Sequence, residues 1–142
     1  MRCGGAEVQV SYLELFDNNI GPVGGMALGQ SLAHGGNLSL LTLKLDYNST
    51  FGTKGVVNLC KGLRSNSTLK QLHLQFCQIS GEESGLALGD VVSSRHSNLE
   101  VLNVGGNRLG GLGLSALARG LMNNSKLTHL SLADNMIDGV CI

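Results

Sequence analysis

A nine-residue pattern recurs five times along the chain and constrains its fold more than any other feature. In each copy, Leu or Val stands at the first, fourth and sixth positions, and Asn or Cys stands at the ninth. The copies begin at residues 10, 40, 69, 99 and 127, so successive starts are 30, 29, 30 and 28 residues apart. Self-similarity at a nearly fixed period of this size indicates a solenoid of stacked units.

The ninth position of the pattern has a specific structural role. An amide side chain can both donate and accept hydrogen bonds, so it can satisfy backbone groups where the chain turns away from a strand. A thiol is a weaker donor. The sequence therefore predicts a ladder of side chains with one rung in each unit: Asn18, Asn48, Cys77, Asn107 and Asn135.

The second half of each unit has helical periodicity. A Gly or Ser at 24, 55, 84 and 113 is followed by two apolar residues that are four positions apart, as in Leu28 and Leu32. Each unit is therefore expected to form a short strand, a turn, a helix and a returning loop. One unit cannot bury its own apolar face, so stacked units share a core, with strands on the concave face and helices on the convex face.

These features resemble those of a known class. The unit length, the Asn/Cys position and the Gly-x-x-x-Leu-x-x-x-Leu helix are similar to the ribonuclease-inhibitor-like class of leucine-rich repeats. Residues 63–72 and 121–130 resemble repeats of NOD-like receptors, Ran GTPase-activating protein and ciliary repeat proteins. The resemblance implies an α/β fold, a right-handed solenoid of about four and a half repeats over residues 10–142, with residues 1–9 as an N-terminal flank.

Composition argues against several classes of partner. Ten basic and ten acidic residues give a formal net charge of zero, whereas a nucleic-acid binder needs clustered cations. No apolar run approaches the roughly 20 residues of a membrane span. The N-terminus has no apolar signal core, and the four cysteines show no metal-ligand spacing. We therefore expect a cytoplasmic protein with reduced thiols, no bound nucleic acid and no membrane insertion.

The positions between the framework residues are free to contact a partner. Side chains alternate along a strand, so these positions point out of the concave face. Four of the five aromatic residues fall there, all in the first three repeats. Exposed aromatics among a few charges are typical of protein-binding surfaces. The predicted partner-binding residues are Tyr12, Glu14, Phe16, Asp17, Lys44, Asp46, Tyr47, His73 and Phe76.

Other interpretations of the concave positions remain open. The aromatics could instead pack against residues 1–9, and Gly105, Gly106 and Ala133 leave the last repeats nearly bare. Either a partner backbone approaches there or nothing binds. His73 and His129 are two repeats apart, and no carboxylate or Cys completes a metal site with them. No catalytic residue and no cofactor site are predicted.

The predicted function is a non-enzymatic scaffold for protein–protein interaction, as a subunit of a larger assembly. One alternative is a regulator of a small GTPase, although there is no acidic tail and no catalytic residue can be assigned. Another is the ligand-sensing repeat domain of an intracellular immune-type receptor. The fifth unit reaches residue 142 after its strand and turn. Because solenoid ends need a cap, we expect another chain or further repeats to cover this edge.

Overall fold

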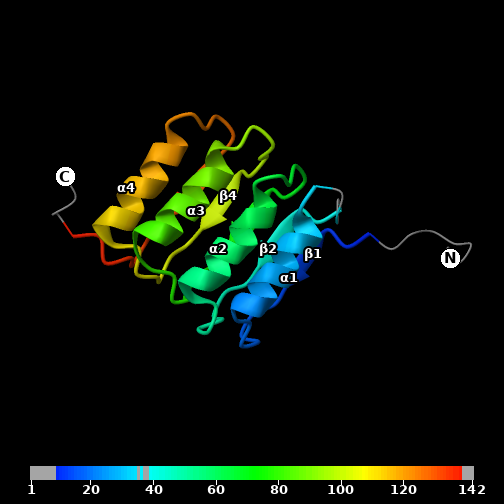
Figure 1. Cartoon of the computed structure of the whole chain (residues 1–142), viewed down its shortest axis with the longest axis horizontal. Helices are drawn as coiled ribbons and strands as arrows, with labels where there is room; N and C mark the ends of the chain where they lie inside the picture. The colour runs from blue at the N-terminus through cyan, green and yellow to red at the C-terminus, as the bar shows by residue number, and fades with distance from the viewer. Residues whose placement is uncertain (1–8, 35, 37–38, 139–142) are drawn as a thin grey trace, which may run out of the picture.

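A computed structural model describes residues 9–34, 36 and 39–138 as strands and helices in strict alternation. The five strands are β1 (Tyr12–Glu14), β2 (Thr42–Lys44), β3 (Gln71–His73), β4 (Val101–Asn103) and β5 (His129–Ser131). The four helices are α1 (Pro22–Leu32), α2 (Gly52–Leu63), α3 (Gly81–Ser93) and α4 (Gly110–Leu121). Figure 1 shows α1 to α4 side by side in chain order.

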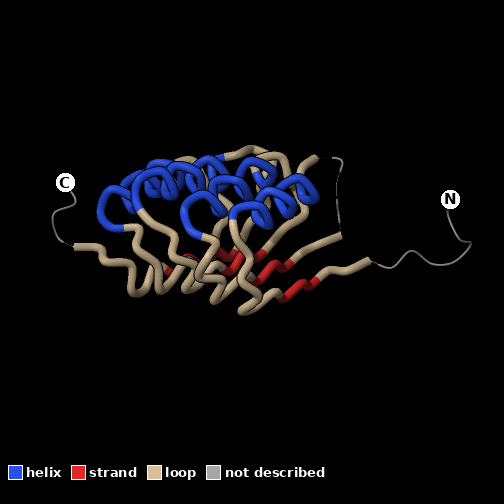
Figure 2. Tube along the Cα trace, turned by 60° about the horizontal axis from the view of Figure 1, so that its bottom comes forward, coloured by secondary structure: helices blue, strands red, loops and turns tan. Residues whose placement is uncertain are grey.

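The strands form one parallel sheet whose order follows the sequence, β1-β2-β3-β4-β5. Its register pairs equivalent positions of successive repeats, so Leu43 lies beside Leu72 and Leu72 beside Leu102. Figure 2 shows the helices along one side of the solenoid and the strands along the other. The predicted solenoid fold is therefore confirmed, whereas the proposed limits of the repeat domain stay a prediction.

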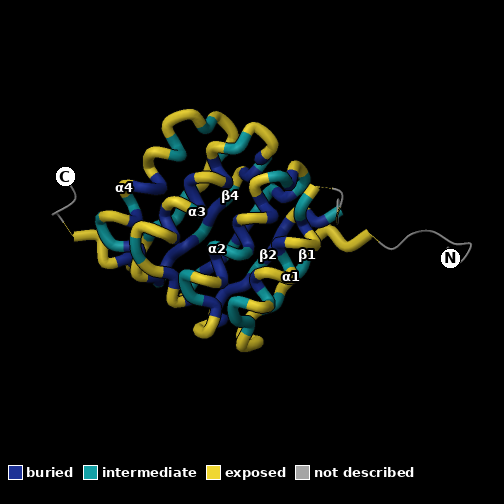
Figure 3. Tube along the Cα trace, viewed as in Figure 1, coloured by how far each residue is buried: buried dark blue, intermediate teal, exposed yellow. Residues whose placement is uncertain are grey.

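The core lies between the sheet and the helices. The framework side chains of the middle repeats, such as Leu43, Leu72 and Leu102, are almost completely buried there. Burying each such leucine contributes on the order of 1.5–3 kcal/mol. Figure 3 shows this buried interior, with exposed segments along the helices, in the loops and at the two ends. The end repeats are less covered, because Leu13 and Leu130 each lack a neighbouring unit on one side among the described residues.

The ninth-position amides tie each turn to the turn of the preceding repeat. The Asn107 oxygen accepts hydrogen bonds from the backbone N–H groups of Cys77 and Ile79, at 3.0 and 3.1 Å. Its amide nitrogen donates to the carbonyls of Leu74 and Val104, both at 2.8 Å. Asn48 makes the equivalent four hydrogen bonds between the first and second repeats. Each of these amides satisfies backbone groups in two repeats at once.

Two of the five ladder positions are incomplete. The Cys77 thiol donates to the carbonyl of Leu45 at 3.1 Å, which reproduces only the donor half of the amide's role. Asn18 is exposed, and its amide nitrogen donates to the carbonyl of Phe16 at 3.1 Å. Asn18 belongs to the first described repeat, so it has no earlier turn to bridge within that part of the chain.

A second set of ladder residues, which the sequence analysis treated as ordinary loop, lies where helices return to strands. The Asn66 amide donates to the carbonyl of Leu32 at 2.9 Å and accepts from the N–H of Leu69 at 2.8 Å. Asn124 bonds in the same way in the fourth repeat. The signal that could have revealed them is Leu-x-x-Asn-x-x-Leu, which occurs at 63–69 and again at 121–127.

Glycines bring the helices together in pairs. A Cβ on Gly29 of α1 would lie 2.7 Å from the carbonyl oxygen of Asn58 in α2, and a Cβ on Gly62 would overlap the backbone of Gly29. Gly89 of α3 and Gly120 of α4 meet backbone to backbone in the same way. Between α2 and α3, by contrast, no glycine of either helix meets the backbone of the other. Many of the glycines in this chain are therefore explained by close helix packing, in addition to those that the turns require.

Replacing the Asn107 amide should destabilise the protein more than replacing its concave neighbour. Asn107→Ala leaves buried backbone groups in two repeats without partners, and each unpaired group costs about 1–3 kcal/mol. The partly exposed Asn103 makes one bond within its own turn, to the N–H of Gly105 at 3.1 Å. We therefore expect a much lower urea midpoint for Asn107→Ala than for Asn103→Ala. Equal midpoints would contradict the ladder role.

The helix pairing makes Gly62→Ala destabilising although alanine is the better helix former. Relief of glycine's helix penalty is worth about 1 kcal/mol. Here the added methyl meets backbone atoms of α1 that cannot rotate away, and overpacking of this kind costs about 1–3 kcal/mol or more. The matched control is Lys61→Ala, the preceding position of α2, which should change the melting temperature little. A Gly62→Ala protein as stable as wild type would disprove the close pairing.

Candidate functional site

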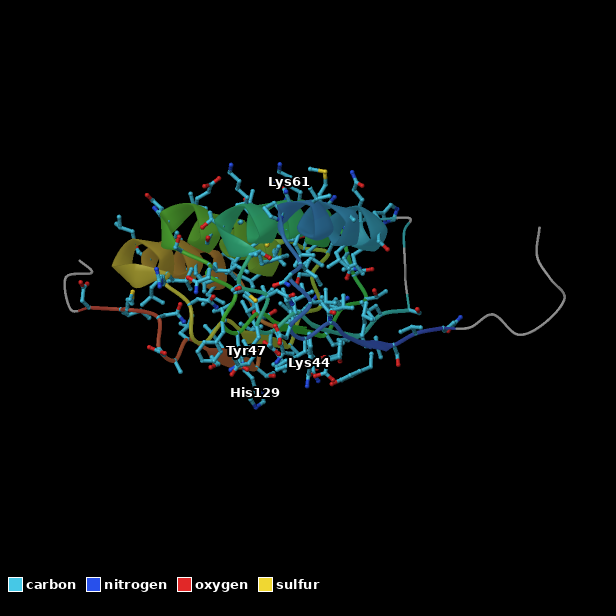
Figure 4. The ribbon with its side chains drawn as sticks, turned by 90° about the horizontal axis from the view of Figure 1, so that it is seen from below. Lys44, Tyr47, Lys61 and His129 are labelled. Atoms are coloured by element: carbon cyan, nitrogen blue, oxygen red, sulfur yellow. The ribbon has the colours of Figure 1, made fainter. Side chains whose placement is uncertain are left out.

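The strand register gathers the predicted partner-binding residues on the concave face. β1 and β2 place Tyr12 beside Thr42 and Glu14 beside Lys44, and β3 adds His73 next to Lys44. Figure 4 shows Lys44, Tyr47 and His129 on the strand side of the molecule and Lys61 on the opposite, helical side. The repeat therefore brings together side chains that are about thirty residues apart in the sequence.

Three aromatic side chains form a continuous row beside the sheet. The ring centroids of Phe16 and Tyr47 are 5.0 Å apart, and those of Tyr47 and Phe76 are 4.8 Å apart with only 21° between the ring planes. Tyr12, Phe16, Tyr47 and Phe76 remain 51%, 50%, 47% and 40% exposed. Half-exposed aromatics in mutual contact have already lost rotamer freedom, so a partner can bury them at lower entropic cost.

An unusual backbone conformation holds two of these three aromatics, Tyr47 and Phe76, in place. The residue before each ladder position has a φ in the left-handed region: Asp17 (52°), Tyr47 (61°), Phe76 (52°), Gly106 (67°) and Asp134 (53°). We call these five residues the rim column. Bulky residues rarely adopt this conformation, and each instance costs about 1–3 kcal/mol that the surrounding structure must offset. The turn geometry, set by the ladder, therefore fixes where the side chains of Tyr47 and Phe76 leave the backbone.

Gly106 has a structural explanation in this row. A Cβ built on Gly106 would lie 2.7 Å from Cζ of Phe76 and closer to two other ring carbons. The Phe76 ring thus lies over Gly106 and needs the absence of a side chain there. The sequence predicts a bare surface at Gly106 in the fourth repeat, but the ring of Phe76 from the third repeat covers part of it.

A second cluster on the concave face joins the first two strands. The Lys44 ammonium lies 5.4 Å from the centre of the Tyr12 ring, which is within the range of a cation–π contact. The Tyr12 hydroxyl donates to the Glu14 carboxylate at 3.3 Å. Hydrogen bonding with Tyr12 raises the pKa of Lys44 above its ordinary value, and burial opposes that rise. Lys44 is therefore a persistent cation between the two strands.

Two predicted site residues differ from the expectation of an exposed, charged surround. Asp46 is only 9% exposed, and its carboxylate accepts a 2.7 Å hydrogen bond from the backbone N–H of Gln75. It therefore fixes the turn of the next repeat, and that part of the expectation needs correction. His73 is half-buried beside Gln71, and burial lowers its pKa below the ordinary value, so the neutral ring is favoured at neutral pH.

The two described cysteines are free, buried thiols. Burial raises the pKa of the Cys60 thiol to about 12 and that of Cys77 to about 11. Both are therefore protonated at neutral pH, and a thiol is far less nucleophilic than a thiolate. Cys3 and Cys141 lie outside the described residues. Cys77 accordingly has a structural position in the ladder.

The described part of the chain offers little for other chemistry. No three His, Cys, Asp or Glu side chains within it come together in a way that could hold a metal ion. None of its helices is both long and apolar enough to cross a lipid bilayer. One interpretation placed residues 1–9 against the aromatics. Of these, residues 1–8 lie outside the described part of the chain, so that interpretation stays a prediction.

Comparisons with known proteins agree with the repeat architecture. The sequence model of a family described as "Leucine Rich repeat" matches residues 10–29, 65–82, 95–118 and 123–140. The mouse (Mus musculus) protein "NACHT, LRR and PYD domains-containing protein 12" is 35% identical over 121 residues, which are 84% of this chain. The chain spans only 11% of that relative's length.

A solved structure is similar in fold. The structure described as "Leiomodin-1 Actin-Binding Site 2 (ABS2)" superposes with a TM-score of 0.67 at 16% sequence identity. The match covers 78% of this chain and 61% of the leiomodin chain. At this level of identity the likeness shows the shared fold alone.

Proposed function

The chain belongs to the leucine-rich-repeat family, and we propose that it binds a protein partner through the concave face of its first three repeats. Solenoids of this kind generally serve as non-enzymatic interaction modules, because stacked repeats create an extended concave surface. The observation that supports the proposal is the row of half-exposed aromatics, Phe16, Tyr47 and Phe76, on that side of the molecule.

The charges around the row suit a protein interface. Glu14, Asp17 and Lys44 surround the aromatics, while Asp46 is engaged by the backbone and takes no part. Aromatic anchors supply much of the free energy of an interface, whereas charges at its margin mainly affect orientation and association rate. Two acids against one base favour a partner surface with some positive charge.

A finer role follows from the same features. We propose a scaffold or subunit of a larger assembly, of the ribonuclease-inhibitor-like class, in the reducing environment of the cytoplasm. Free buried thiols at Cys60 and Cys77 support that location. The 35% sequence identity with the mouse NACHT, LRR and PYD domains-containing protein favours one second candidate. This candidate is a repeat segment with a sensing role in a multidomain protein. No observation favours a regulator of a small GTPase.

Removing either central ring should weaken binding without unfolding the protein. Asparagine is the suitable replacement for Tyr47 and Phe76, because it tolerates a left-handed backbone better than alanine. Loss of an anchor often costs about 2 kcal/mol of binding free energy, or roughly 30-fold in affinity. Loss of one ring contact should cost about 0.5–1.5 kcal/mol of stability. Partners recovered from native extract should be tested with both variants in parallel with thermal melts.

The control for this experiment is Leu112→Ala, which removes an exposed apolar side chain from α4 on the convex side. It should leave affinity unchanged. Lys44→Ala should weaken binding mildly, with an effect that fades as salt is added. Aromatic variants that lower the melting temperature but keep full affinity would show that the row serves packing only.

We propose a second contact at the edge of the sheet beyond β5. Further repeats or another chain cover this edge. Leu130 and Leu132 are half-buried, and Ile137 is 40% exposed, whereas their counterparts in the middle repeats are buried. The isolated chain should therefore self-associate in sedimentation experiments, and Ile137→Asp should reduce the association. A soluble monomer at all concentrations, with residues 127–138 protected from hydrogen exchange, would contradict this.

A further inference from the structure

The rim column has an apolar centre whose chemistry can be specified. The faces of Tyr47 and Phe76 are stacked on each other, and Phe76 lies over Gly106. Cations bind to ring faces, and the stacking covers one face of each ring, so less ring face is left for a cation. A bulky apolar side chain that packs on these half-exposed rings buries further apolar surface. The centre of the rim column therefore suits a bulky apolar group better than a cation.

The two ends of the rim column are acidic. Asp17 in the first repeat and Asp134 in the fifth are both exposed. Among residues 9–34, 36 and 39–138, neither carboxylate forms an ion pair. Arg108 follows the ladder residue Asn107 and lies in the loop that leads to α4, outside the rim column. A partner with cations at both ends of an apolar group would match this charge pattern.

Small residues border the column in the last two repeats. Gly105 is buried and Ala133 is exposed, so the position before each rim residue carries no side chain larger than a methyl group in these two repeats. A Cβ on Gly105 would be 3.3 Å from the Asn103 oxygen, so the fold itself tolerates a side chain there with only a small adjustment. At the exposed Ala133 of the fifth repeat, the small side chain lets a partner's main chain lie close to the sheet.

The length of the column fits a short extended segment. Neighbouring strands of a sheet are about 4.8 Å apart, so the four intervals from Asp17 to Asp134 span about 19 Å. An extended chain rises about 3.3 Å per residue, so about six residues cover that span. The midpoint between Tyr47 and Phe76 is about 7 Å from Asp17, or roughly two partner residues, and about 12 Å from Asp134, or roughly four.

We propose that the partner engages the rim column through an extended segment of about six residues with a bulky apolar centre and a Lys or Arg near each end. The segment lies across the strands, its apolar group against Tyr47 and Phe76 and its cations at Asp17 and Asp134. This inference rests on the proposed function and adds the chemistry of the partner.

The test uses a random octapeptide display library selected on the immobilised 142-residue chain. Enriched peptides should contain aromatic or large aliphatic residues with Lys or Arg at unequal distances on the two sides. The most enriched peptide, synthesised and labelled, should bind at least tenfold more weakly to the Asp17→Asn, Asp134→Asn double variant. Asparagine keeps the left-handed backbone, and a thermal melt checks that the variant is folded. The matched control is Asp90→Asn on α3, which should bind like wild type.

Several results of the peptide selection would overturn the inference. Enriched peptides that lack basic residues, or that keep their affinity for the double variant, would remove the role of the two carboxylates. Unchanged binding to Tyr47→Asn would remove the role of the rings. No enrichment would exclude a linear segment, while native partners that still depend on Tyr47 and Phe76 would leave concave-face binding intact.

A second copy of the chain is the competing occupant of the rim column. Sedimentation of wild type and Tyr47→Asn distinguishes it from a foreign segment. Self-association that disappears in Tyr47→Asn but persists in Ile137→Asp would assign the column to a second copy and overturn the inference. Identical sedimentation of wild type and Tyr47→Asn supports the peptide segment.

Discussion

The hydrogen bonds of the ladder amides are the interaction on which the other features depend. Each strand ends in a tight turn whose backbone groups are buried, and buried polar groups must be paired. Asn48 and Asn107 pair them across two repeats at once, so each turn adopts its conformation only with its neighbour in place. Stacking is thereby cooperative, which agrees with the one-dimensional energetics of solenoids.

The same turns create the surface that we assign to binding. The residue before each ladder position is held in the left-handed region, and it therefore leaves the sheet at a fixed angle in every repeat. The side chain at this rim-column position is not part of the core, so the repeat pattern leaves its residue type free. The chain places aromatics at Tyr47 and Phe76, glycine at Gly106, and acids at the two ends. A structural constraint thus provides a regular row of sites, and the side chains placed on it decide what is recognised.

The convex side is built on a different principle. α1 pairs with α2 and α3 with α4 through glycine backbones, whereas no glycine of α2 or α3 meets the backbone of the other. Close backbone approach leaves no room for adjustment, so the relative position of paired repeats is fixed more tightly than that of successive pairs. The second ladder residues, Asn66 and Asn124, fall in the even repeats and strengthen the same two-repeat unit.

The sequence by itself determined the repeat, the register and the inward-facing residues. These follow from strand alternation and a fixed period, which are local and need no knowledge of distances, so Leu43, Leu72 and Leu102 could be assigned to the core directly. Most of the concave residues were also placed correctly, but the exposure of Asp46 was not. Only the tertiary structure decided that Asp46 is held by the N–H of Gln75, that Phe76 covers Gly106 and that the helices pair. Those outcomes depend on contacts between atoms about thirty residues apart, where a few tenths of an ångström separate a fit from an overlap, and no pattern of residue types records such distances.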